Sequence, residues 1–323
     1  MAASRKLRQS EVPARLAEFL ARCLPREARL CVGLSGGCDS VSLLHALVQC
    51  WPIAQISAVH VHHGLSPHAD AWADFCVDLA DSLAVPLALH RVTVDRCAGL
   101  GLEAAARTAR YAVFAGQSCD ALLLAQHRGD QAETVLFNLL RGSGLLGAAG
   151  MPSDRIEGGL RILRPLLSVT RLAIETYARD QGLSWVEDES NGDLHFSRNY
   201  LRHRTLPELA ERFPGCEGAL AGAAERFGEA QALLDELALQ DWRLAADGDA
   251  ARLAVLRTLS LPRLKNLLRY RLRLLGWQAP VANRLNEFAR QLQVAGPDRH
   301  PELCLPAGRM FCRHGAVHWL AEK

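Results

Sequence analysis

The sequence predicts an α/β fold, a parallel-sheet domain followed by a smaller, mainly helical domain. Short apolar runs alternate with helical patterns through the first half of the chain, which is the rhythm of βαβ units with helices on both faces of a sheet. A glycine turn also joins the first apolar run directly to a helical pattern. From about residue 216 the chain becomes rich in Ala, Leu and Glu at helical spacing. We therefore expect domains at 1–215 and 216–323.

The elements are predicted in chain order from their hydrophobic periods. The Arg-rich N-terminal segment has an apolar face of Val12, Leu16, Phe19 and Leu20, which favours a docked helix over a transit peptide. In the first domain we expect strands at 29–34, 56–61, 87–94, 121–125 and 160–167, and helices at 40–48, 70–83, 103–117, 131–141 and 170–182. The glycine-rich segment 142–159 is expected to be a loop over the carboxyl ends of the strands. In the second domain we expect helices at 216–246, 261–275 and 280–293, and two strands within 302–320.

Composition excludes several classes of protein. No segment approaches the roughly 18 consecutive apolar residues of a membrane span. The ten cysteines contain no C-x-x-C pair, which argues against zinc ribbons, thioredoxin-like sites and many iron–sulfur ligand sets. We interpret them as buried, reduced thiols of a cytoplasmic protein. Residues 29–215 contain no lysine, so a Walker A lysine or a pyridoxal-phosphate Schiff base cannot lie there.

The turn between 35 and 40 has the composition of a phosphate-binding loop. Gly36 and Gly37 allow close approach of the backbone to phosphate oxygens at a helix N-terminus, and Ser35 and Ser40 can add hydroxyl donors. Asp39 would repel a phosphate unless a divalent cation lay between them, so this residue argues for Mg²⁺. The alternatives are an ordinary strand-to-helix turn and simple capping by Asp39.

Residues 35–40, Ser-Gly-Gly-Cys-Asp-Ser after a strand, resemble the PP-loop of the N-type ATP pyrophosphatases, which have an adenine nucleotide alpha hydrolase-like fold. Further segments resemble, in order and spacing, the tRNA(Ile)-lysidine synthetase family. These segments are VHVHHGLSPHAD at 59–70, GLEAAARTARYAVF at 101–114, LAQHRGDQAETVLFNLLRGSGLLGAAGM at 124–151, LRPLLSVTR at 163–171 and WVEDESNGDLHFSRNYLRHRTLPEL at 185–209.

The resemblance implies a reaction and its reactants. The family joins free L-lysine to C2 of the wobble cytidine in the CAU anticodon of tRNA(Ile), consuming ATP and releasing AMP and pyrophosphate. It implies ATP binding by Ser35, Gly36, Gly37, Cys38, Asp39 and Ser40, with Mg²⁺ held by Asp39. The cytidine O2 would attack the α-phosphorus, and the lysine amine would then displace AMP.

The stretch 127–133 supplies acids for the lysine. If a helix begins near Asp130, then Asp130 and Glu133 share a face and can hold or deprotonate an amine. The alternative is a first helical turn enriched in acids for dipole reasons. The resemblance adds His127 to the catalytic residues. Many family members have two aspartates before the glutamine, and the first of these is Gly129 here, so Asp130 would act alone.

Arginines and one histidine complete the expected site. Arg202 matches a family arginine that resembles a contact to the α-phosphate, and its fork suits two phosphate oxygens. Arg107 and Arg110 are expected to line the cytidine or the tRNA backbone, although a solvated helix face explains them nearly as well. His63 is expected to contact adenosine, with a structural histidine as the equal alternative.

The second domain has a basic run, with six basic residues from 257 to 273 and no acid until Glu287. On its own this run reads as a solvated helix. With a tRNA substrate, Arg269, Arg271 and Arg273 become candidates for phosphate contacts. Many relatives continue into a third, C-terminal domain, which we expect to be absent from this chain. Homodimers are common in the family, and the sequence leaves a homodimer open.

Three other functions compete with this expectation. A tRNA thiolase of the two-thiocytidine branch would need paired C-x-x-C cysteines, which the sequence lacks. A glutamine-dependent amidotransferase would need a glutaminase domain, and only 28 residues precede the first predicted strand. A non-catalytic tRNA-binding or nucleotide-sensing homologue is disfavoured by the joint presence of Asp39, Asp130, Glu133 and Arg202.

Overall fold

The computed structural model describes residues 11–94, 102–296 and 299–322. The chain divides into two compact units, at 1–226 and 227–323. The division lies within one long helix, α10 (Cys216–Ala245). Nowhere in the described ranges does a helix have the length and apolar character needed to cross a bilayer.

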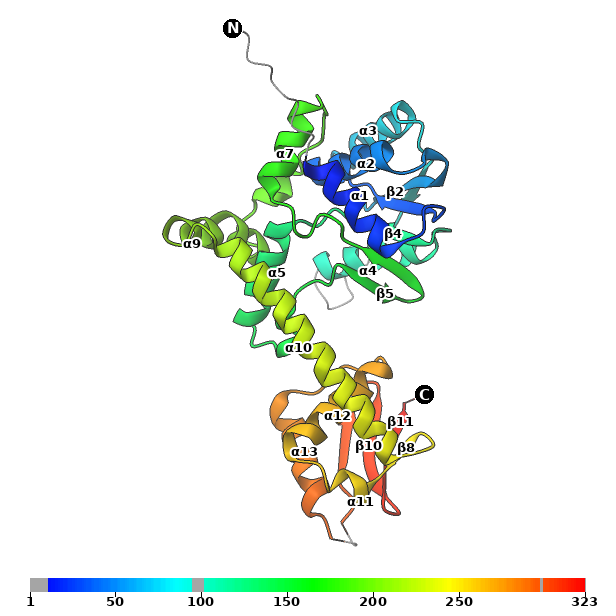
Figure 1. Cartoon of the computed structure of the whole chain (residues 1–323), viewed down its shortest axis with the longest axis vertical. Coiled ribbons are helices and arrows are strands. Elements are labelled where there is room, and N and C mark those ends of the chain that lie inside the picture. The colour runs from blue at the N-terminus through cyan, green and yellow to red at the C-terminus, as the bar shows by residue number, and fades with distance from the viewer. Residues whose placement is uncertain (1–10, 95–101, 297–298, 323) are drawn as a thin grey trace. The chain divides into compact units, whose positions relative to one another are not determined.

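The first unit contains a six-stranded sheet, which confirms the predicted α/β class (Figure 1). The strand order is β3-β2-β1-β4-β6-β5, and all neighbours are parallel except β5 and β6. The order runs outward from β1 in both directions, so β1 and β4 flank a topological switch point, where open α/β sheets bind ligands. The strands are β1 (Leu30–Gly33), β2 (Ile56–His62), β3 (Leu87–Arg91), β4 (Ala121–Leu123), β5 (Asp154–Glu157) and β6 (Leu160–Leu163).

The helices of this unit agree with the periodic segments of the sequence. The N-terminal helix α1 docks as expected, because Val12, Leu16 and Leu20 are buried in the core together with residues of α2. Strand β1 faces this core through Leu30 and Val32 and a second core on the opposite face through Cys31. The longer helices are α1 (Glu11–Cys23), α2 (Cys38–Cys50), α3 (Ala69–Ser82), α4 (Leu102–Ala115), α5 (Arg128–Leu140) and α7 (Arg171–Asp180).

Short helical elements and turns close the first unit. They are η1 (Ile53–Gln55), α6 (Leu145–Ala148), η2 (Glu189–Gly192), α8 (Ser197–Tyr200), the π-helical turn η3 (Leu201–Thr205) and α9 (Leu206–Arg212). Helices α8, η3 and α9 follow one another without a break. The π turn is the irregular part of this run, and such turns are frequent at functional sites.

The prediction of a loop throughout 142–159 is wrong. This segment contains α6 and β5, and β5 forms an antiparallel hairpin with β6. Gly158 and Gly159 form the turn with φ of +58° and +85°, the left-handed values that a tight hairpin of two residues needs. The glycines were interpreted as a sign of a long loop, whereas they mark a turn between two strands.

The second unit is helical with a small antiparallel sheet. Its helices are α11 (Leu253–Leu256), α12 (Leu261–Leu274), α13 (Ala282–Val294) and the end of α10. The sheet order is β7-β8-β11-β10-β9, where two strands were expected. The strands are β7 (Ala246–Asp247), β8 (Ala250–Arg252), β9 (Glu302–Leu305), β10 (Gly308–Arg313) and β11 (Ala316–Ala321). Strands β7 and β8 are too short to give a periodic signal in the sequence.

The cysteines are free thiols in the described part of the chain, and Cys97 lies outside it. Most are buried or half-buried. The interpretation of all cysteines as buried is wrong at Cys304, which is exposed on the first strand of the second sheet.

Gly308 is the most constrained glycine of the second unit. Its φ is +150°, and a Cβ there would meet the carbonyl oxygen of Leu320 and lie 2.6 Å from Trp277. Gly228, inside α10, has open space around its Cα. Gly308→Ala should lower the free energy of unfolding by about 2 kcal/mol, whereas Gly228→Ala should raise it by about 1 kcal/mol because alanine is the better helix former. Urea unfolding of both variants measures the two shifts. Equal effects would contradict the close approach at Gly308.

Candidate functional site

Residues 35–40 form a tight loop between β1 and α2. Gly36 has φ of +88°, and its carbonyl accepts a hydrogen bond from Val186 N at 3.0 Å. A Cβ on Gly36 would lie 2.8 Å from Val186 Cγ2. Gly37 is the N-cap of α2, and no side chain of the described residues caps this helix. The first turn of α2 therefore offers backbone N–H groups to an anion.

The two serines hold the shape of this loop. Ser40 Oγ accepts from Ser35 N at 3.1 Å and donates to Gly37 O at 3.0 Å, and the two serine hydroxyls lie 3.0 Å apart. Cys38 is buried in the first core, and this burial raises the pKa of its thiol. The side chain of Cys38 therefore packs inward, and only its backbone can contribute to the loop's concave side.

Asp39 faces α5 and α7 across the switch point. Its Oδ2 accepts from Arg171 Nη1 at 2.5 Å and lies 4.0 Å from His127 Nε2. Its Oδ1 is buried and has no hydrogen-bond partner among the described residues. Burial raises the pKa of this carboxyl, while His127 and Arg171 act in the opposite direction. Asp39 does not cap α2. The N-cap residue is Gly37, and Asp39 lies in the first turn of the helix.

The free Oδ1 suits a hard cation that also touches phosphate. No group of three or more His, Cys, Asp or Glu side chains gathers as a metal site among the described residues. Mg²⁺ needs no such group, since it is commonly held by one or two carboxylates and by the phosphates of the substrate. Asp39 therefore fits a magnesium–nucleotide complex.

His127 is the N-cap of α5. Its Nδ1 accepts from Gly129 N at 3.0 Å and from Asp130 N at 3.4 Å, and Asp130 Oδ2 accepts from His127 N at 3.0 Å. This reciprocal capping box assigns the imidazole proton to Nε2. That nitrogen lies 3.5 Å from Asp130 Oδ2 and points toward Asp39. His127 thus links the loop after β4 to the loop after β1.

The structure gives a local reason for a glycine at position 129. A Cβ at this position would lie 2.9 Å from His127 Cε1 and 3.1 Å from His127 Nδ1. The capping imidazole occupies the space that an aspartate at 129 would need. An aspartate at 129 would therefore require the His127 ring to shift.

Asp130 and Glu133 share one face of α5, as the spacing predicts, and both bind Arg202. Arg202 Nη2 lies 2.8 Å from Asp130 Oδ1 and 2.7 Å from Glu133 Oε2, and Arg202 Nε donates to the same Glu133 oxygen at 2.9 Å. Arg198 Nη1 donates to Glu133 Oε1 at 3.4 Å. The π turn η3 carries Arg202, and α8 carries Arg198.

The electrostatics of this cluster depend on burial. The Glu133 side chain is 2% exposed, and this burial raises the pKa of its carboxyl, while Arg202 and Arg198 lower it. A buried carboxylate needs such partners. The acids predicted to hold an amine are therefore occupied by guanidinium groups in this structure.

Three predicted residues of the first domain remain: His63, Arg107 and Arg110. Arg110 contacts His63, and Arg107 contacts Tyr111. Arg110 Nε and Nη2 both lie 3.4 Å from His63 Nε2. Burial, Arg110 and the neighbouring histidines lower the pKa of His63 to about 4. Arg107 Nη2 donates to Tyr111 Oη at 3.0 Å, and its guanidinium lies 4.6 Å from the Tyr111 ring centroid. His63 and Arg110 are therefore direct neighbours, and a ligand that contacts one side chain also meets the other.

The three arginines of α12 have different surroundings. Arg271 stacks on Trp242 at 3.7 Å from the ring centroid and lies 5.7 Å from that of Trp319. Arg273 pairs with Asp235 at 2.5 Å, whereas Arg269 is exposed. Arg271 therefore packs into its own unit, and Arg269 is the one of the three that is open to a polyanion.

Two further arginines of the site, Arg171 and Arg198, were not predicted from the sequence. Arg171 begins α7 and contacts Asp39, and Arg198 begins the RNYLR stretch and contacts Glu133. Both arginines lie within the segments quoted for the family resemblance, at 163–171 and 185–209. Neither contact could be found from spacing, because each joins segments that are distant in the sequence.

Two family models and several related proteins match this chain. A PP-loop domain model matches residues 8–209, and a model of the TilS substrate binding domain matches residues 252–318. The tRNA(Ile)-lysidine synthase of Alkalilimnicola ehrlichii is 43% identical over 312 residues, covering 95% of this chain and 70% of that protein.

The chain belongs to the tRNA(Ile)-lysidine synthase family.

A second family member, from Nitrosomonas europaea, is 43% identical over 297 residues. The match covers 90% of this chain and 65% of that protein, so the chain spans just under two thirds of that relative's length. Among solved structures, the U34-tRNA thiolase of Methanococcus maripaludis with its 4Fe–4S cluster has a TM-score of 0.57 at 18% identity. The likeness covers 68% of this chain and 79% of that one, and it supports the fold alone.

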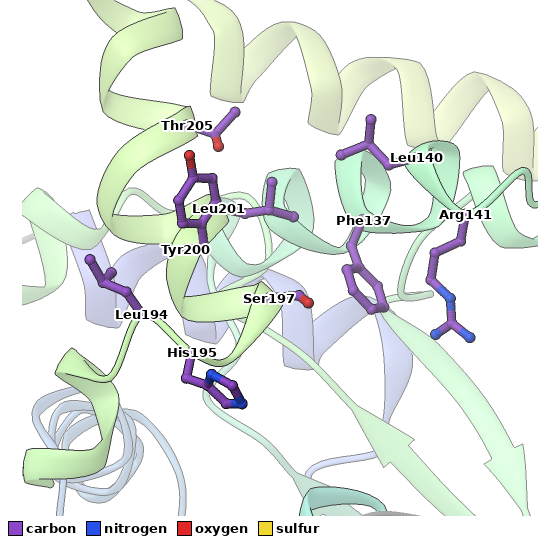
Figure 2. A pocket seen from close by; sticks show the side chains of 9 residues that line it. All are labelled: Phe137, Leu140, Arg141, Leu194, His195, Ser197, Tyr200, Leu201 and Thr205. Atoms are coloured by element: carbon purple, nitrogen blue, oxygen red, sulfur yellow. The ribbon is translucent and has the colours of Figure 1, made fainter.

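A pocket of about 450 Å³ is lined by residues of α5 and of the segment 194–205 (Figure 2). Phe137, Leu140 and Arg141 line it from α5, and Tyr200 and Leu201 line it from the segment 194–205 (Figure 2). The remaining lining residues are Leu194, His195, Ser197 and Thr205. None of them was singled out from the sequence.

The low pKa of His63 predicts a pH dependence of stability. Between the ordinary histidine value near 6.5 and the folded value of about 4, the unfolded chain binds more protons than the folded chain, so stability falls as pH falls. His63→Gln should therefore lose less free energy of unfolding than the parent between pH 7 and pH 5. Urea unfolding at both pH values measures the difference, with His300→Gln, an exposed position, as the control. Equal losses in the parent and His63→Gln would contradict a neutral His63.

Proposed function

We propose that this chain ligates L-lysine to C2 of the wobble cytidine in the CAU anticodon of tRNA(Ile), using ATP and forming lysidine. One observation carries the proposal: the PP-loop and its Asp39 face the His127, Asp130, Glu133 and Arg202 cluster across the switch point. A nucleotide held by the loop would place its phosphates next to paired carboxylates and arginines. Membership of the synthase family supports the choice of substrates.

ATP would be held by the backbone of the PP-loop. The N–H groups of the first turn of α2 face the phosphates, and Ser35 and Ser40 keep the loop in shape. Mg²⁺ would be held by Asp39 Oδ1, and when bound it supplies positive charge that offsets the charge of the phosphates. His63, paired with Arg110, remains the candidate for the adenosine contact.

Two bond changes complete the proposed reaction. The cytidine O2 forms a bond to the α-phosphorus while the bond to pyrophosphate breaks. The lysine amine then forms a bond to C2, loses a proton, and AMP departs with the oxygen. Arg202 is suited to charge on the α-phosphate because its planar fork binds two oxygens.

The carboxylate cluster suggests how lysine would be received. Asp130 and Glu133 hold a cationic side chain in this structure, so the same oxygens suit an ammonium group. If Arg202 turns to the phosphate, the two carboxylates lose a partner that the lysine amine can replace. Glu133, whose pKa burial raises, is also suited to accept the amine's proton.

The tRNA would contact exposed basic residues of both units. Arg107 is exposed on α4 and Arg269 on α12, while Arg110 is shared with His63. ATP, lysine and tRNA are all available in the cytoplasm, where we place the enzyme. A homodimer remains compatible with the proposal.

Two other functions predict different results. A tRNA thiolase of the two-thiocytidine branch would need C-x-x-C cysteine pairs, which the sequence does not contain. A non-catalytic tRNA-binding homologue would bind tRNA without ATP turnover. ATP–pyrophosphate exchange stimulated by tRNA separates the binding homologue from the synthase, because a binding protein would show none.

The direct experiment is incubation with ATP, Mg²⁺, labelled L-lysine and tRNA(Ile) bearing CAU. We expect labelled lysidine in the digested RNA, and no label with methionine tRNA, which shares the anticodon. A labelled product with no dependence on ATP, or no label under any condition, would refute the function.

Asp39→Asn keeps the shape of the loop and removes the charge proposed for Mg²⁺. We expect lysidine formation to fall by at least about a hundredfold, as for loss of a main electrostatic group. Asp74→Asn, an exposed position on α3, should leave the rate unchanged. The measurement is turnover over a range of Mg²⁺. Near-normal turnover of Asp39→Asn at saturating Mg²⁺ would assign Asp39 a structural role only.

Glu133→Gln should separate the two half-reactions, because the amine enters only after adenylation. With ATP and tRNA but no lysine, the variant should still release pyrophosphate slowly. Lysine should accelerate this release far less than in the parent, and transfer to cytidine should be abolished. Equal loss of both half-reactions would contradict a role of Glu133 in lysine transfer alone and would move the lysine pocket elsewhere.

A further inference from the structure

The pocket shown in Figure 2 lies one helical turn from the buried carboxylate of the site. Phe137 follows Glu133 by four residues on α5, so both residues lie on one face of the helix. Arg198 joins them, because its guanidinium lies 5.4 Å from the Phe137 ring centroid while Nη1 donates to Glu133 at 3.4 Å. Arg198 therefore connects Phe137, which lines the pocket, to Glu133 of the site.

The lining combines aromatic and aliphatic surface with positive charge. Tyr200 is 53% exposed and Leu140 is 69% exposed, so this side of the molecule leaves a large apolar area in contact with solvent. Arg141 lies 5.1 Å from the Phe137 ring centroid, so Phe137 has a guanidinium from each of two segments near its ring. Aromatic platforms beside arginines are the usual surface for an unstacked base and its phosphates.

We propose that this pocket binds one unstacked nucleobase of the substrate RNA, from a nucleotide next to the reacting cytidine. The inference rests on the proposed function, in which the cytidine O2 attacks the α-phosphate of an ATP held by the PP-loop, and Asp130 and Glu133 receive the lysine that bonds to C2 of the same base. Phe137 is seven residues beyond Asp130, or about 10 Å along the helix. A single pyrimidine cannot occupy both places, so the neighbouring nucleotide enters the pocket.

Charge separates this occupant from free lysine. The alkyl chain of lysine would match the apolar lining, but its ammonium group would face Arg141 on the pocket wall and Arg198 beside Phe137. A nucleotide has the complementary sign, since its phosphate is anionic, and its base can stack on the exposed ring of Tyr200. The lining therefore favours a nucleotide.

The test is binding of tRNA(Ile) to the full chain without ATP, using three variants. Tyr200→Ala removes an exposed ring and should raise Kd about tenfold, the effect of losing one base–aromatic stack. Tyr200→Phe keeps the ring and should stay within about twofold of the parent. Phe213→Ala removes a ring that is 59% exposed and does not line the pocket, so it should bind as the parent does.

Transcripts with an abasic site on the 5′ or the 3′ side of the wobble cytidine then identify the partner. We expect one of these transcripts to bind the parent and Tyr200→Ala equally, because the stack is already lost. A tenfold ratio that persists on both abasic transcripts would overturn the inference, as would an equal loss in Phe213→Ala. A higher KM for lysine with unchanged tRNA binding would assign the pocket to lysine and also overturn it.

The two proposals fail in different ways. If the parent does not bind tRNA at all, the proposed function fails and this inference fails with it. If the parent binds tRNA and forms lysidine but shows no coupling between Tyr200 and a neighbouring base, only this inference fails.

Discussion

The site depends on one buried carboxylate and the arginine that neutralises it. Glu133 lies in α5 with almost no exposure, and Arg202 reaches it from η3, 69 residues further along the chain. Without a cation a carboxylate at this depth would be strongly unfavourable, so the position of η3 is tied to that of α5. The same guanidinium also binds Asp130 and thereby orders the first turn of the helix.

Sheet topology places this pair where chemistry can use it. Strands β1 and β4 are parallel neighbours at the switch point, so the loops after them meet at one edge of the sheet. One loop supplies the anion cradle and Asp39, and the other supplies the His127 cap. The acid of the first loop and the capping box of the second face each other through His127 Nε2.

Much of this arrangement could be predicted from local sequence. The strand–glycine–helix pattern indicated the cradle, and the spacing of Asp130 and Glu133 indicated their shared face. The contacts of Arg171 and Arg198 could not be predicted, because they depend on how distant segments pack. The surroundings of Arg271 could not be predicted either. The basic run predicts an exposed side chain at this position, whereas in the structure Arg271 stacks on Trp242. The family resemblance marks Gly129 as the position of a missing aspartate. In the structure, the His127 ring lies where a side chain at position 129 would begin.

A double-mutant cycle on the free energy of unfolding tests the central interaction most directly. The variants are Glu133→Gln, Arg202→Gln and the two combined, each unfolded in urea at pH 7. Because each single change already removes the whole Glu133–Arg202 interaction, we predict that the double variant loses less than the sum of the singles, by at least about 1 kcal/mol. Additive losses, equal within about 0.5 kcal/mol, would contradict the claim that the Glu133–Arg202 pair holds the site together.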